Sequence, residues 1–257
     1  MNYMFQGICS NGVNLKLDLS GWNTSNVKSM SAMFYDCRTL KTIYVSDSWN
    51  TDNVTSSSSM FTNCTSLVGD NGTKYNSSYT NKTYARIDKA GAPGYLSEKP
   101  YKLKTGLAFN ALIPETTTAV VFTDEVKPSS ATAIDLGVTG YNPVVGWLEG
   151  TTFKVSSQVS GKKIALNENS SYMFCGRSNY GNKTTKTQNI ASITGLGTLD
   201  TSKVTNMSSM FDYTGYNVAT FNLDISGWNT SNVISMSDMF YRAGYSATTW
   251  SIGDLSN

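Results

Sequence analysis

The sequence contains no histidine, and only 15% of its 257 residues are charged. Without histidine, the chain cannot form a Ser/His/Asp or Cys/His catalytic site, and it lacks the commonest general base near neutral pH. Its 20 basic and 18 acidic residues nearly balance, giving a net charge of +2. Nucleic-acid-binding proteins usually concentrate Lys and Arg on one face, so this balance argues against such a partner.

Other common features are also missing. There is no run of 18 apolar residues, so no segment is predicted to insert in a membrane. The opening residues MNYMFQG carry neither the basic nor the apolar region of a signal peptide. The cysteines at positions 9, 37, 64 and 175 form no CxxC pair. From these absences we predict no enzyme activity, no catalytic residues, no metal site and no cofactor.

The sequence is strongly repetitive. The segment LDLSGWNTSNVKSMSAMF, residues 17–34, differs at three of eighteen positions from LDISGWNTSNVISMSDMF, residues 223–240. A Met-Phe pair occurs six times, in MNYMF, MSAMF, SSSMF, SSYMF, MSSMF and MSDMF. Equivalent residues lie 27 to 29 positions apart, as do Phe34 and Phe61. A unit of this length is too short to bury its own core, so neighbouring repeats are expected to stack.

Each repeat has a simple local pattern. Leu17–Leu19 alternates apolar and polar residues, which predicts a short strand. Val27 and Met30 begin a series with the spacing of one face of a short helical turn. One strand and one short helix per repeat predict an α/β leucine-rich-repeat solenoid, in two blocks at residues 1–68 and 170–257.

The middle of the chain follows a different pattern. Residues 69–100 are rich in Gly, Asn, Ser, Tyr and Lys, and we interpret them as a closing cap and linker. Residues 101–169 contain short alternating segments typical of strands, with hairpin turns expected at 149–151 and 160–162. We therefore expect a β-rich opening cap, a small antiparallel meander of four or five strands, covering the second block of repeats.

The string LDLSGWNTSNVKSMSAMFYDC resembles the repeat of BspA-like bacterial surface proteins, a leucine-rich-repeat family with the consensus LDLSxxxTSNVTxMxxMFxxC. The match is strong over residues 17–67 and 201–240. Residues 69–97 resemble the segment that closes such arrays, and residues 109–171 resemble the segment that opens a new one. The resemblance implies an extracellular or cell-surface protein that binds a protein or glycan on another cell surface, with no enzymatic activity.

Two functions remain open from the sequence. The first is adhesion, through many weak contacts along a rigid solenoid face. The second is that of a structural fibre or filament subunit, including a phage tail-fibre component, which would self-associate through open solenoid ends. Met1–Phe5 aligns with Met236–Phe240, so we expect a window from a longer repetitive protein whose anchor lies elsewhere.

Several repeat positions invite a functional interpretation, but for most of them a core role is favoured. Trp22, Trp49 and Trp228 share one position with Leu199, which favours core packing over sugar stacking. The Met-Phe pairs are expected in the core because they recur on the apolar side of the expected helical turn. Asp18 and Asp224 share a position expected on the exposed strand face. Turns are expected at Asp70-Asn71-Gly72, rather than a calcium loop, and at Asp124-Glu125.

The cysteines and tyrosines leave alternatives open. Cys37 and Cys64 are equivalent residues, about 5 Å apart if they stack as neighbouring strands do. That distance is compatible with a disulfide. A reduced, buried pair is the favoured interpretation; Cys9 extends the same ladder, and Cys175 is out of register. Nine tyrosines lie outside the core pattern. Exposed tyrosines are typical of recognition surfaces, but they can equally take the place of the charged residues that are scarce on this surface. The nine are Tyr35, Tyr75, Tyr79, Tyr84, Tyr95, Tyr213, Tyr216, Tyr241 and Tyr245.

Overall fold

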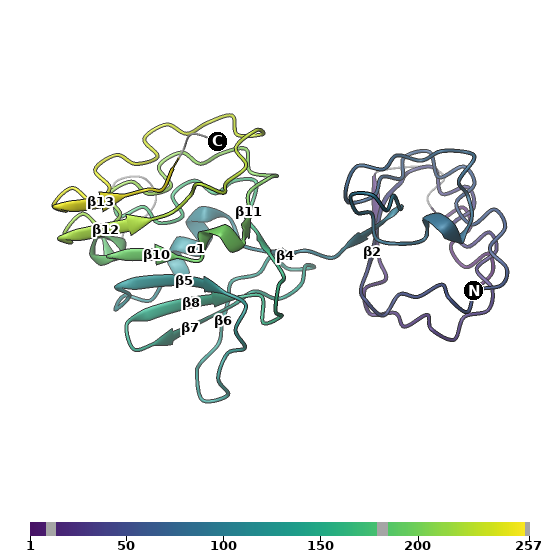
Figure 1. Ribbon diagram of the computed structural model, residues 1–257, viewed down its shortest axis with the longest axis horizontal. Helices are drawn as coiled ribbons and strands as arrows, with labels where there is room; N and C mark the ends of the chain where they lie inside the picture. The colour runs from purple at the N-terminus through teal and green to yellow at the C-terminus, as the bar shows by residue number, and fades with distance from the viewer. Residues whose placement is uncertain (9–13, 179–184, 255–257) are drawn as a thin grey trace. The chain divides into compact units, whose positions relative to one another are not determined.

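The computed structural model describes residues 1–8, 14–178 and 185–254, so Cys9 lies outside the described residues. The chain divides into two compact units, Met1–Lys99 and Pro100–Asn257 (Figure 1). None of the helices in the described ranges is long and apolar enough to cross a membrane.

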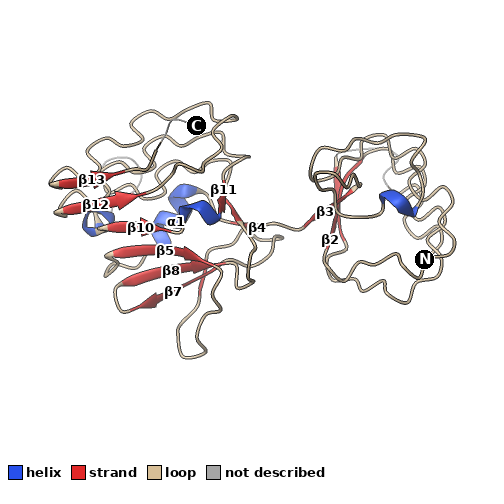
Figure 2. Ribbon diagram, viewed as in Figure 1, coloured by secondary structure: helices blue, strands red, loops and turns tan. Residues whose placement is uncertain are grey.

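The first unit contains a parallel sheet in the order β1-β2-β3. Strands β2 and β3 are labelled in Figure 2. The strands are β1 (Leu15–Asp18), β2 (Leu40–Val45) and β3 (Leu96–Glu98), and the 3₁₀ helix η1 (Lys82–Tyr84) precedes β3. Leu17 lies opposite Ile43, and Ile43 lies opposite Leu96. The strand expected at Leu17–Leu19 is therefore β1, shifted by one or two residues.

The Met-Phe segments of successive repeats are hydrogen-bonded to each other. The backbone N–H groups of Met30, Ala32 and Phe34 donate to the carbonyls of the next repeat, at 2.8–2.9 Å. The helical turn expected here does not form, because Ala32 has a φ of 52° and the segment adopts turns. With every second N–H group donating to the neighbouring repeat, the backbone is satisfied without a helix.

A column of aromatic rings runs through the core of the first unit. The rings of Phe5, Phe34 and Phe61 follow one another at centroid distances of 5.6 and 5.5 Å, with interplanar angles of 7° and 9°. Tyr95 ends the column edge-on, 5.2 Å from Phe61. Because Tyr95 is fully buried, it belongs to the core, and its assignment to the tyrosines outside the core was wrong.

The thiols of the first unit follow the same spacing. Cys37 and Cys64 are buried, and each Sγ donates to a carbonyl of the preceding repeat, to Phe5 at 2.9 Å and to Phe34 at 3.0 Å. The core position expected for both cysteines is confirmed.

The second unit contains a mixed sheet in the order β13-β12-β10-β5-β8-β7-β6. All neighbouring pairs from β13 to β8 are parallel, whereas β7 is antiparallel to both β8 and β6. A smaller parallel sheet has the order β11-β9-β4. The strands of the larger sheet are β5 (Ala119–Thr123), β6 (Ile134–Asp135), β7 (Val145–Glu149), β8 (Thr152–Ser156), β10 (Ser192–Thr194), β12 (Thr220–Leu223) and β13 (Thr249–Ser251). The remaining elements are β4 (Tyr101–Lys102), β9 (Ile164–Ala165), β11 (Leu199–Asp200), the α-helix α1 (Gly106–Leu112) and the 3₁₀ helices η2 (Lys186–Asn189) and η3 (Leu196–Thr198).

The antiparallel meander expected at residues 101–169 is only partly correct. The β7–β8 hairpin forms at the expected turn, where Gly150 adopts a φ of 62°. However, β5 is parallel to β8, because β5 also pairs with β10 and continues the parallel strands of the repeats. A turn forms at 160–162, but it is not a hairpin, since β9 joins the smaller sheet.

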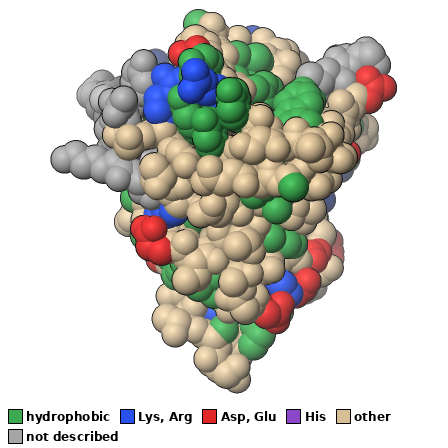
Figure 3. Space-filling view, turned by 90° about the vertical axis from the view of Figure 1, so that its left-hand side faces the viewer, with side chains coloured by type: hydrophobic (Ala, Val, Ile, Leu, Met, Phe, Trp, Pro, Cys, Tyr) green, Lys and Arg blue, Asp and Glu red, His purple; other side chains and the backbone are tan. Residues whose placement is uncertain are grey.

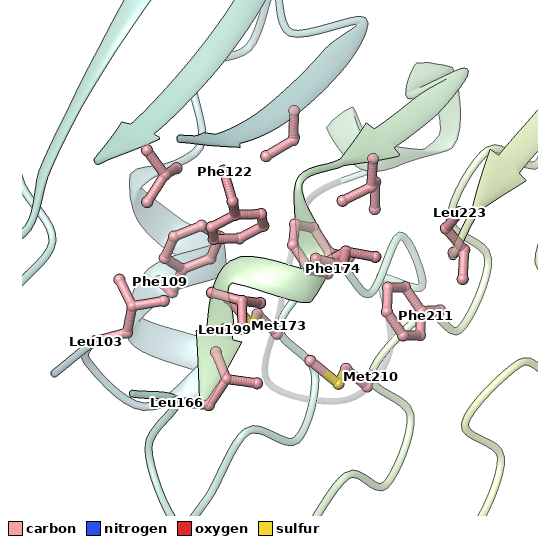
Figure 4. Close-up of a cluster of buried hydrophobic side chains, with 14 of the residues drawn as sticks. Leu103, Phe109, Phe122, Leu166, Met173, Phe174, Leu199, Met210, Phe211 and Leu223 are labelled. Atoms are coloured by element: carbon pink, nitrogen blue, oxygen red, sulfur yellow. The ribbon is translucent and has the colours of Figure 1, made fainter. Parts of the chain in front are cut away.

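Helix α1 and strand β5 cover Phe174, the first ring of an aromatic column in the second unit (Figure 4). Phe109 of α1 and Phe122 of β5 lie 5.7 and 6.3 Å from Phe174, both nearly perpendicular to it. Beyond Phe174, the rings of Phe211 and Phe240 follow at 5.4 Å each, with interplanar angles of 6° and 2°. The second unit therefore has the same aromatic column as the first.

Most of the Met-Phe pairs occupy the core, as expected. Met33, Met60, Met173, Met210 and their following phenylalanines are buried, whereas Met4 is 50% exposed. Trp22, Trp49 and Trp228 are partly buried against the two cores. The indole Nε1 groups of Trp49 and Trp228 donate to backbone carbonyls at 2.9 and 3.3 Å. These contacts support packing rather than an open platform for sugars.

Candidate functional site

Four tyrosines and two arginines of the second unit gather in the turns that follow the Met-Phe pairs. We call this group the tyrosine–arginine surface; it consists of Arg177, Tyr213, Tyr216, Tyr241, Arg242 and Tyr245. All four tyrosines belong to the set expected outside the core. On the face drawn in Figure 3, hydrophobic side chains lie beside Lys and Arg side chains, among mostly uncharged atoms.

The backbone of adjacent repeats holds these turns in register. The N–H group of Tyr213 donates to the Tyr241 carbonyl at 2.8 Å, and that of Gly244 donates to the Thr214 carbonyl at 2.8 Å. Gly215 and Gly244 precede Tyr216 and Tyr245 with φ values of 62° and 58°. A Cβ atom at Gly215 would lie 2.4 Å from the Phe221 ring, so both conformation and space require glycine there.

The tyrosine rings form a short stack. Tyr216 lies 5.0 Å from Tyr213 and 4.9 Å from Tyr245, with interplanar angles of 16° and 4°. Tyr241 lies 5.8 Å from Tyr213, at an angle of 45°. Tyr245 remains 62% exposed and Tyr241 43% exposed, so the stack is ordered by its own contacts and still accessible to a partner.

Arg177 pairs with a buried acidic group. Its Nε lies 2.9 Å from Oδ2 of Asp212, a fully buried carboxylate, and its guanidinium lies 4.4 Å from the ring centre of Tyr241. Burial raises the pKa of Asp212 to about 6, although the neighbouring Arg177 acts in the opposite direction. Burial also raises the pKa of the adjacent Cys175 thiol to about 11, which makes it a poor nucleophile near neutral pH.

Arg242 is held differently. Its guanidinium lies 5.4–5.6 Å from the ring centres of Tyr213, Tyr241 and Tyr245, and its Nη1 donates to the Tyr213 hydroxyl at 2.9 Å. The arginine side chain is exposed. Three tyrosine rings therefore surround and position a solvent-accessible positive charge.

The tyrosines of the first unit have mainly structural contacts. Tyr84 lies 5.0 Å from the buried Tyr95, and Tyr79 stacks on Tyr84 at 4.5 Å. The Tyr75 hydroxyl accepts from the N–H group of Asn63 at 3.2 Å. Tyr35 is partly buried. These residues support the segment that follows the first block of repeats.

The other acidic residues considered from the sequence are held by neighbouring donors. Asp18 pairs with Lys99 at 2.6 Å, whereas Asp224 accepts from the N–H group of Ser226 at 3.0 Å and borders a hollow of about 410 Å³. Asp124 accepts from the Gly161 N–H group at 2.7 Å, and Glu125 pairs with a lysine. In the part of the chain that the structure describes, no group of three or more acidic or thiol side chains could hold a metal ion.

The turn at 70–72 is organised by a residue outside the sequence pattern. The buried carboxylate of Asp88 accepts from the N–H groups of Asn71, Thr73 and Gly94 at 2.9–3.1 Å and from the Thr73 hydroxyl at 2.7 Å. These donors hold the pKa of Asp88 below its usual value against the effect of burial. A carboxylate that accepts four hydrogen bonds makes this a structural turn.

The interactions within the tyrosine–arginine surface had only a weak signal in the sequence. The tyrosines could be found because they lie outside the core pattern, and Tyr216 and Tyr245 follow glycines in equivalent turns. Nothing in the repeat pattern identified Arg177 or Arg242. Their contacts with Tyr213 and Tyr241 arise only when three repeats are stacked.

Comparison with known proteins gives one family assignment. A family model described as "Mycoplasma protein of unknown function, DUF285" matches residues 1–92 and 157–252. No curated protein and no solved structure matches the chain. The matched segments contain both sets of Met-Phe repeats and leave out strands β3 to β8 and helix α1, and together they cover more than half of the sequence. The chain belongs to the DUF285 family.

Proposed function

We propose that this chain is a non-enzymatic recognition segment of a BspA-like bacterial surface protein. It binds a protein or glycan on another cell surface through the tyrosine–arginine surface. The observation that carries the proposal is the accessible stack of Tyr216 and Tyr245 beside Arg242. Tyrosine and arginine are enriched at binding interfaces because they offer large contact areas with few freely rotating bonds.

We further propose that both units are solenoids of the leucine-rich-repeat type. The proposal is supported by parallel strands and aromatic columns that join residues of successive repeats. A rigid solenoid of this kind holds its surface turns in fixed positions, so a partner is bound without first ordering them. Several copies on one cell surface would multiply a weak contact by avidity.

The proposed function can be tested with the chain displayed in many copies on beads. Binding to panels of bacterial and host cells is compared between the unaltered chain and the double variant Tyr241→Ala/Tyr245→Ala. We expect the double variant to lose most of the binding. Tyr79→Ala is the matched control, because Tyr79 is 44% exposed and stacked on another tyrosine in the first unit. Equal binding of all three proteins would contradict the proposal.

A second candidate function is that of a fibre subunit. It is favoured by apolar side chains exposed in the second unit, where Ile234 is 87% exposed, Trp250 46% and Met236 41%. Trp250 lies on β13, an edge strand of its sheet, and edge strands can pair with another chain. Light scattering tests this candidate: self-association that Ile234→Lys abolishes would support it, and a concentration-independent monomer would exclude it.

A further inference from the structure

We propose that the tyrosine–arginine surface binds an acidic sugar, whose carboxylate contacts Arg242 while its ring packs against Tyr245. This inference depends on the proposed recognition function and adds the chemical class of the ligand to it.

Arg242 differs from the arginines of similar turns in how its charge is paired. Arg177 pairs with Asp212 at 2.9 Å, and Arg38, in the equivalent turn of the first unit, pairs with Asp36 at 2.8 Å. Among the residues that the structure describes, Arg242 has no such carboxylate, and its polar contact is the Tyr213 hydroxyl. Aromatic faces hold a guanidinium in place without cancelling its net charge. Arg242 is therefore an accessible, positioned cation.

An arginine of this kind suits a carboxylate. The guanidinium carries five N–H donors in a planar fork, and one bond to a phenol leaves the others able to reach an anion. Two parallel N–H groups match the two oxygens of a carboxylate, and such charged hydrogen bonds are stronger than neutral ones. Because the three rings already fix the guanidinium, little conformational freedom is lost when the anion binds.

The neighbouring ring favours a sugar. Tyr245 stacks on Tyr216 at 4.9 Å yet stays 62% exposed, so it offers a flat apolar surface 5.5 Å from the Arg242 guanidinium carbon. The apolar face of a pyranose ring can pack there while its carboxylate reaches the arginine. Ser246 and Asn217 are exposed on the same two turns and can bond sugar hydroxyls. A protein surface rich in acidic residues, or a polyanion, would call for several such cations.

The test compares two oligosaccharides that differ only at the carboxyl group. One contains glucuronic acid, and the other is its carboxyl-reduced counterpart, in which each carboxylate has become a primary alcohol. Both are immobilised at equal density, and binding of the bead-displayed chain is measured at low and at physiological salt. We expect the acidic form to bind about tenfold more tightly at low salt. This preference should shrink as salt screens the exposed arginine.

Variants separate the two parts of the site. Arg242→Gln should abolish the preference for the acidic form, while Tyr245→Ala should weaken binding of both forms. The matched control is Arg38→Gln, because Arg38 already has Asp36 as partner, and it should behave as the unaltered chain. Circular dichroism of each variant checks that the fold is retained. A preference that survives Arg242→Gln, or no preference in the unaltered chain, overturns the inference.

The outcome also separates this inference from the proposed function. If cells are bound through Tyr241 and Tyr245 but neither oligosaccharide form is preferred, the surface recognises something other than an acidic sugar, and only the inference is refuted. If the Tyr241→Ala/Tyr245→Ala variant binds cells as the unaltered chain does, the proposed function itself is refuted.

Discussion

The buried ion pair of Asp212 and Arg177 predicts an unusual dependence of stability on pH. Asp212 is fully buried, and its Oδ2 lies 2.9 Å from Nε of Arg177. Burial disfavours the charged carboxylate more than the arginine favours it, so the pKa of Asp212 rises from 3.8 to about 6. The substitution Asp212→Asn keeps the shape of the side chain and removes the titration.

The size and sign of the effect follow from this pKa. At about 1.4 kcal/mol for each pH unit, the rise from 3.8 to about 6 corresponds to about 3 kcal/mol. The folded state holds the proton more tightly than the unfolded state. The contribution of Asp212 is therefore fully present below about pH 4 and is lost as the pH rises through about 6. Relative to the unaltered chain, Asp212→Asn should gain about 3 kcal/mol between pH 4 and pH 7.

Urea denaturation at a series of pH values measures this difference. Tryptophan fluorescence follows both units, because Trp22 and Trp49 lie in the first unit and the buried Trp147 lies in the second. The transition that Asp212→Asn shifts is that of the second unit. The control is Asp124→Asn, since hydrogen bonds from Gly161 and Ser160 lower the pKa of Asp124 from 3.8; its effect should stay nearly constant between about pH 5 and pH 7 and change, with the opposite sign, only at more acidic pH. A difference between Asp212→Asn and the unaltered chain that is constant with pH, or falls towards neutral pH, would refute the reasoning.

Three further substitutions give direct tests of the fold. Arg177→Met leaves a buried carboxylate without its cation and should cost about 3–5 kcal/mol at neutral pH, measured by urea denaturation, and less near pH 4. Gly215→Ala should lower the melting temperature more than Gly150→Ala; both glycines have a φ of 62°, but only at Gly215 would the new Cβ meet a ring, that of Phe221, at 2.4 Å. Phe34→Ala removes the middle of an aromatic column and should cost about 3–5 kcal/mol, in the transition of the first unit alone; an unchanged midpoint there would contradict the column's role.

Some features of this protein could be predicted from sequence because they depend on local periodicity. The Met-Phe pairs and the tryptophans recur at a fixed spacing, and a repeated apolar position must be buried wherever repeats stack. The β7–β8 hairpin was predictable for a similar reason, since Gly150 supplies the positive φ that a tight turn needs. Cys37 and Cys64 were placed in the core by the same register.

Other predictions were wrong, or could not be made, because different structures share the same local sequence pattern. Apolar residues spaced for a helical face also suit the observed turns, in which residues such as Ala32 adopt a left-handed conformation and N–H groups bond to the next repeat. The parallel direction of β5 is set by its neighbour β10, which lies far along the chain. Tyr95 lies in a segment with the composition of a surface, yet its ring ends the aromatic column.

The sequence by itself determined the repeat length, the buried side chains of each repeat and the family to which the chain belongs. Tertiary structure alone decided the composition of the candidate site. Arg177, Tyr213 and Tyr241 come from three successive repeats, and their contacts exist because stacked backbones hold the turns in register. Whether an arginine is neutralised, as Arg177 is by Asp212, or remains a positioned cation, as Arg242 does, depends on side chains that meet only in the folded stack.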